Sequence, residues 1–123
     1  MVSSEQLAAS RPLAPFESDR VRLARTALTA ALAVPGVLGA DSGPHGAFVT
    51  EATRGERLPG VACVAAPGGG YDVSLRLIAG LVPLHPLGEQ IRIAVARAAV
   101  IAGIAAQDVS VHFAEIAAAG EWR

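Results

Sequence analysis

Two alanine-rich segments with helical periodicity, at residues 19–34 and 87–102, bracket two strand-like runs that are joined by three glycines. Each segment repeats apolar residues at three- and four-residue spacing, which is typical of a helix that buries one face. A helix with one apolar stripe needs a surface to cover, and the sheet formed by the intervening strands provides it. The sequence therefore predicts an α+β domain with two helices packed on one face of a small, mostly antiparallel sheet. The expected order is helix, four strands, helix, strand.

The expected strands are short, and the glycines mark the best-defined turn. Residues 71–77 alternate between apolar and polar side chains, so this strand should have one buried face. Residues 68–70 are all glycine and can adopt the positive φ angles of a tight hairpin. Residues 51–60 hold most of the central charges and are expected to form a loop. The remaining predicted strands cover residues 37–41, 47–50, 61–66 and 109–113.

The chain is expected to form one domain, over residues 18–117. Residues 1–17 mix serine, proline and alanine without periodicity, so we expect a flexible N-terminal lead-in. Ser18 is a plausible N-cap for the first helix. Residues 118–123 are expected to be a short tail.

The composition narrows the classes of function. Charged residues make up 17% of the chain, below the roughly 25% that is usual in soluble domains. The net charge of −1 offers no field that would attract nucleic acid. No stretch approaches the ~18 apolar residues of a membrane span, and the first residues lack a signal-peptide pattern. We therefore expect a cytoplasmic protein that does not itself cross the membrane.

The residues that could carry chemistry are few and scattered. Cys63, the single cysteine, lies in an apolar strand without a neighbouring cation, which suits a structural thiol better than a nucleophile. His45, His85 and His112 lack the short spacings of a zinc site. The three glycines lead into a strand rather than a helix, so they do not form a phosphate-binding loop. We expect no catalytic, cofactor-binding or metal-binding residues and hence no enzyme.

One feature of the second helix is not explained by a single buried face. Its core stripe leaves a second apolar ridge, well over 100° away around the helix. This ridge could pack against another subunit, a partner helix or a membrane-anchored protein. Equally, the N-terminal lead-in or the first helix could cover it. The candidate interface residues are Ile93, Ala96, Val100 and Ile104.

Several short motifs resemble a known bacterial family. Residues 31–37 (Ala-Leu-Ala-Val-Pro-Gly-Val) resemble the end of its first helix, and residues 58–61 (Leu-Pro-Gly-Val) resemble the start of its central hairpin. Residues 87–91 (Leu-Gly-Glu-Gln-Ile) resemble its second helix start, with Leu87 where an aromatic residue is usual. The last strand and the Gly-Ile before it, residues 103–113, resemble its ending. In order and spacing, the chain resembles the alkaline-shock and general-stress family of envelope stress response proteins of Gram-positive bacteria.

The resemblance implies a function that the residues alone do not. It implies a non-enzymatic cytoplasmic protein that forms homo-oligomers and is held at the inner face of the membrane by a small transmembrane anchor protein. It links the chain to cell-envelope homeostasis and places it among the short variants of high-GC Gram-positive bacteria, the actinobacteria. The alternative from the residues is a small nucleic-acid-binding or ligand-binding α+β module. The missing basic excess argues against nucleic-acid binding.

Overall fold

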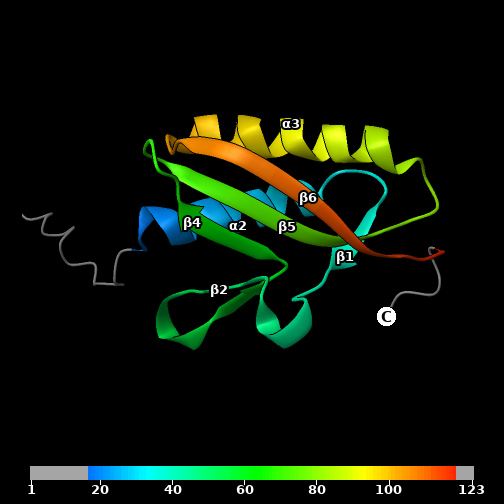
Figure 1. Cartoon of the computed structure of the whole chain (residues 1–123), viewed down its shortest axis with the longest axis horizontal. Helices are drawn as coiled ribbons and strands as arrows, with labels where there is room; N and C mark the ends of the chain where they lie inside the picture. Colours follow the sequence, from blue (N-terminus) through cyan, green and yellow to red (C-terminus); the bar gives the residue numbers. More distant parts are fainter. Residues whose placement is uncertain (1–16, 119–123) are drawn as a thin grey trace, which may run out of the picture.

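The computed structural model describes residues 17–118 and has the predicted α+β architecture. Helices α2 (Asp19–Leu32) and α3 (Leu84–Ala102) lie on one face of a four-stranded sheet, α2 behind β4 and α3 beside β6 (Figure 1). The predicted lead-in and tail lie outside the described residues, apart from Glu17 and Ala118. The strands are β1 (Val37–Ala40), β2 (Val49–Glu51), β3 (Arg57–Pro59), β4 (Val61–Ala65), β5 (Tyr71–Ala79) and β6 (Ala106–Ile116).

Strand β5 is the centre of the sheet. One edge of β5 pairs antiparallel with β4 along residues 71–75 and then with β1 along residues 77–79. Its other edge pairs in parallel with β6, which returns to the sheet after α3. Val73, Leu75 and Leu77 of β5 are fully buried and make up much of the core. The sheet is thus antiparallel except for the β5–β6 pair, which needs a crossover helix to connect it.

The predicted hairpin between β4 and β5 is present. Gly69 and Gly70 have φ angles of 103° and 70°, and the pairing begins at Ala65 opposite Tyr71. By contrast, the prediction of a loop over residues 51–60 is wrong in part. Residues 57–59 form β3, which pairs antiparallel with β2 as a separate two-stranded ribbon.

Side-chain contacts fix this ribbon to the rest of the fold. Thr50 is buried, and its hydroxyl donates a 2.8 Å hydrogen bond to the carbonyl of Val61 at the start of β4. On the helix side, Arg25 of α2 pairs with both Glu17 and Glu56. The ribbon is therefore attached at one end to the sheet and at the other to α2.

Helix α2 begins as predicted, with Ser18 as its N-cap. The hydroxyl of Ser18 accepts a hydrogen bond from the N–H of Val21, which is the N-cap arrangement. Leu23 is fully buried, whereas Leu32 in the last turn is 42% exposed.

Helix α3 starts three residues before the predicted Leu87. Pro83 is the N-cap residue in an extended conformation, so the first turn runs from Leu84 and includes Pro86. Proline is tolerated there because first-turn N–H groups have no partner within the helix. The earlier start makes α3 a helix of 19 residues.

The C-terminal end of α3 corrects one predicted interface residue. Gly103 adopts a left-handed conformation with φ of 75°, and its N–H bonds to the carbonyl of Val100. The next N–H, of Ile104, bonds back to the carbonyl of Ala99 at 3.1 Å. This pair of bonds is a Schellman motif, which turns the residue after the glycine back against the helix. Ile104 is accordingly buried, with 6% exposed, and is not part of the outer surface of α3.

Candidate interaction surfaces

The outward side of α3 exposes large apolar side chains. Ile93 and Val100 are 55% and 79% exposed, and Ala96 between them is also exposed. They lie opposite the buried stripe of α3, which consists of Leu87, Ile91, Val95 and Ala99. We call Ile93, Ala96 and Val100 the α3 ridge. Contacts between α2 and α3 leave this ridge open. Ile101, not assigned to the ridge from the sequence, is 82% exposed on its flank.

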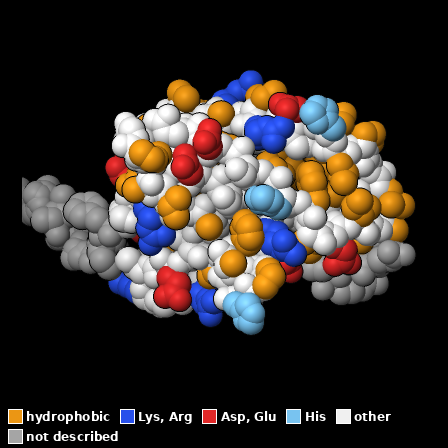
Figure 2. Space-filling model, viewed as in Figure 1, with side chains coloured by type: hydrophobic (Ala, Val, Ile, Leu, Met, Phe, Trp, Pro, Cys, Tyr) orange, Lys and Arg blue, Asp and Glu red, His pale blue; other side chains and the backbone are white. Residues whose placement is uncertain are grey.

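A second apolar surface lies where β5 leads into α3. Leu81 and Val82 in this connection are 75% and 40% exposed. Ile116, 49% exposed, is at the same end of the sheet because its register partner is Ala79 at the end of β5. Figure 2 shows apolar side chains gathered at this right-hand end of the molecule. We call Leu81, Val82 and Ile116 the apolar end.

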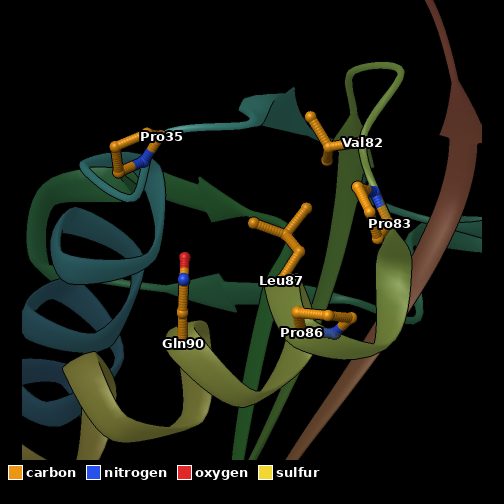
Figure 3. A pocket seen from close by; sticks show the side chains of 6 residues that line it. All are labelled: Pro35, Val82, Pro83, Pro86, Leu87 and Gln90. Carbon is orange, nitrogen blue, oxygen red and sulfur yellow. The ribbon is translucent and has the colours of Figure 1, made fainter.

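A shallow groove of about 200 Å³ borders the apolar end. Figure 3 shows Leu87 in the middle of it, with Pro35 and Gln90 on one side and Val82 and Pro83 on the other. The turn after α2 is held here by a 2.8 Å hydrogen bond from the N–H of Gly80 to the carbonyl of Gly36. The walls of the groove are apolar apart from the side-chain amide of Gln90. The signal in the sequence is a run of uncharged residues from 78 to 88.

The sheet face opposite the helices carries a small polar cluster. Arg76 of β5 pairs with Asp41 at 2.8 Å, and its guanidinium lies 5.8 Å from the centre of the Phe48 ring. His112 of β6 packs edge-to-face against the same ring, with 5.5 Å between ring centres. The hydrogen bond from Arg76 lowers the pKa of the Asp41 carboxyl. These contacts connect the loop before β2 to the sheet. Arg76 and His112 both pack against a side chain of that loop, Phe48.

The residues considered for chemistry are not brought together. Within residues 17–118, no three histidine, cysteine, aspartate or glutamate side chains are close enough to hold a metal ion. Cys63 is 5% exposed, and burial raises the pKa of its thiol to about 11. Such a thiol carries almost no thiolate at neutral pH, and thiolate is the reactive form.

Neither helix of the described chain has the length and hydropathy that crossing a bilayer requires. Comparison with known proteins adds no relative: no family model, curated protein or solved structure matches the chain.

Proposed function

We propose that this protein is a non-enzymatic envelope stress response protein that acts by self-association and by binding a membrane-anchored partner. In this proposal it works in the cytoplasm at the inner face of the cell membrane. The link to the cell envelope comes from the sequence motifs that resemble the alkaline-shock and general-stress family. The observation that carries the protein-binding part is the exposure of Ile93, Val100 and Ile101 on the outward side of α3.

The amount of exposed apolar surface supports a binding role. Isolated exposed apolar residues are common, but contiguous ones on a monomer usually mark an interaction site. Here exposed apolar residues form two groups, the α3 ridge and the apolar end. Two surfaces, the α3 ridge and the apolar end, allow one copy to bind a second copy and a different partner at once.

The test is co-purification from membrane extracts of the source cells with a tagged chain. We expect a small protein with one transmembrane segment to be captured by the wild type. The variants Leu81→Glu and Val100→Glu each place a carboxylate on one of the two surfaces. Thr29→Glu is the matched control, because it adds the same charge at an exposed position of α2.

The proposal predicts that at least one of the two surface variants loses the membrane protein while Thr29→Glu keeps it. Val100→Glu should also reduce the oligomer size in solution, measured by light scattering. If all four chains are monomers and capture the same proteins, the proposal is wrong.

A further inference from the structure

The charged residues beside the α3 ridge are arranged symmetrically about Ile93. Glu89 lies four residues before Ile93, and Arg97 lies four residues after it. Residues spaced by four lie in one row on a helix surface, so these three side chains form one outward row. Both charged residues are exposed. Glu89 pairs with Arg92 of the same helix, whereas Arg97 has no ion-pair partner among the described residues.

We propose that two copies of this chain pair through α3, antiparallel, about a two-fold axis that passes next to Ile93. The inference rests on the proposed function and specifies its self-association. In a two-fold interface, any contact from one copy to the other occurs twice. An axis at Ile93 places Glu89 of each copy against Arg97 of the other. Ile93 then packs against its own equivalent, in the centre of the contact.

The other ridge residues fit the same axis. Val100 lies seven residues after Ile93 and Pro86 seven before it, so Val100 of one copy faces Pro86 of the other. Ala96 and Gln90, three residues away on either side, also oppose each other. The small Ala96 side chain permits the 8–10 Å axis separation that is usual for packed helices. Two apolar contacts therefore flank the central isoleucine pair.

The charges select this orientation over a parallel one. In a parallel pair in register, Glu89 would face Glu89 and Arg97 would face Arg97, and like charges across an interface are strongly unfavourable. In the antiparallel pair, the carboxylate of each Glu89 can accept hydrogen bonds from Arg92 of its own chain and from Arg97 of the other chain. One helix pair is a small interface, so we expect a dimer that dissociates on dilution.

The first experiment is a charge exchange, read by analytical ultracentrifugation over a series of concentrations. Glu89→Arg and Arg97→Glu alone should each raise the dissociation constant by about tenfold or more, because each creates two like-charge contacts. The double variant exchanges the charges, and its dissociation constant should return to within about threefold of the wild type. Circular dichroism melting checks that each variant is folded. Failure of the double variant to recover, with its fold intact, would overturn this pairing.

The second experiment locates the axis by crosslinking. Cysteine at position 93 (Ile93→Cys) lies beside its own equivalent in the dimer, within the ~6 Å between Cα atoms that a disulfide needs. It should form a covalent dimer quickly under mild oxidation. Val100→Cys is the control, because residue 100 lies about two turns away from the axis and should crosslink poorly. Cys63 is buried and should not compete. Equal or faster crosslinking of the control would overturn the axis.

The two proposals can fail separately. A wild-type chain that stays monomeric at every concentration, yet still captures a membrane protein, overturns the two-fold pairing and the self-association in the proposed function, and leaves its partner-binding part standing. If Val100→Glu then loses the captured protein, the α3 ridge is the site of that partner. A monomer that captures nothing overturns both.

Discussion

Gly60 lies against Ala40 at the point where β4 and β1 follow each other along one edge of β5. A Cβ atom added to Gly60 would lie only 2.4 Å from the Cβ of Ala40. On the β5 side, the N–H of Arg76 donates to the carbonyl of Gly60, and the carbonyl of Arg76 accepts from the N–H of Asp41. One residue of β5 thus joins both neighbouring strands, and there is room for this only because residue 60 has no side chain.

Replacing Gly60 by alanine should destabilise the fold strongly. The φ angle of 93° adds strain to the clash with Ala40, so we expect a loss of about 2–4 kcal/mol in the free energy of unfolding. Gly69→Ala is the matched control, because Gly69 has a φ of 103° and no atom near the added Cβ. It should cost about 1 kcal/mol, from strain alone. Equal losses in urea unfolding would contradict the close packing at Gly60.

Arg54 offers a stabilising substitution. It has a left-handed φ of 65°, is exposed, and lies in the short turn (Thr53–Gly55) between β2 and β3. Arg54→Gly should raise the free energy of unfolding by about 0.5–1 kcal/mol, because glycine adopts this conformation without a Cβ clash. Arg54→Ala removes the same side chain and keeps the strain, so it should give no such gain. A thermal melt of the three proteins distinguishes the two cases.

The thiol of Cys63 should be nearly inert in the folded protein. Burial raises its pKa from 9.0 to about 11, which lowers the thiolate fraction at pH 8 by about a hundredfold. We expect reaction with a disulfide reagent to be slow in buffer and fast in denaturant. The native rate should keep rising with pH up to about 11. Fast native reaction at pH 8 would mean that β4 opens readily or that Cys63 is accessible.

The ion pair of Asp41 and Arg76 should make stability depend on pH in acid. The hydrogen bond from Arg76 lowers the pKa of Asp41 below its ordinary 3.8 in the folded state. Its stabilising contribution is therefore present above pH 3.8 and is lost as the pH falls through the folded-state pKa. Asp41→Asn should show a smaller loss of stability between pH 5 and pH 2 than the wild type, which urea unfolding at each pH measures. The same slope in both proteins would show that this pair contributes little.

Local patterns in the sequence predicted most of the elements. The alternation in residues 71–77 and the glycines before it predicted β5 and its hairpin, because the buried face and the turn are set by neighbouring residues. Strand β3 was missed because its three residues become a strand only by pairing with β2. A strand of three residues is too short to show a clear alternation, so its pairing with β2 leaves no periodic pattern in the sequence.

The candidate surfaces were likewise predicted only in part from the sequence. Helical periodicity placed Ile93, Ala96 and Val100 correctly on the outer side of α3. It placed Ile104 there as well, because the pattern continues past Gly103 although the helix does not. The groove beside Leu87 could not be predicted, since its wall includes Pro35, a residue about fifty positions earlier in the chain.

The central place of β5 also has a consequence during translation. Its parallel neighbour β6 is the last strand of the described residues, and it emerges from the ribosome only after all of α3. Until then one side of β5 has no strand beside it, and the nascent chain exposes backbone groups that other chains can pair with. Pairing of β6 with β5 is therefore the step that completes the described sheet, and a product that is truncated within β6 should be a substrate for cellular proteases.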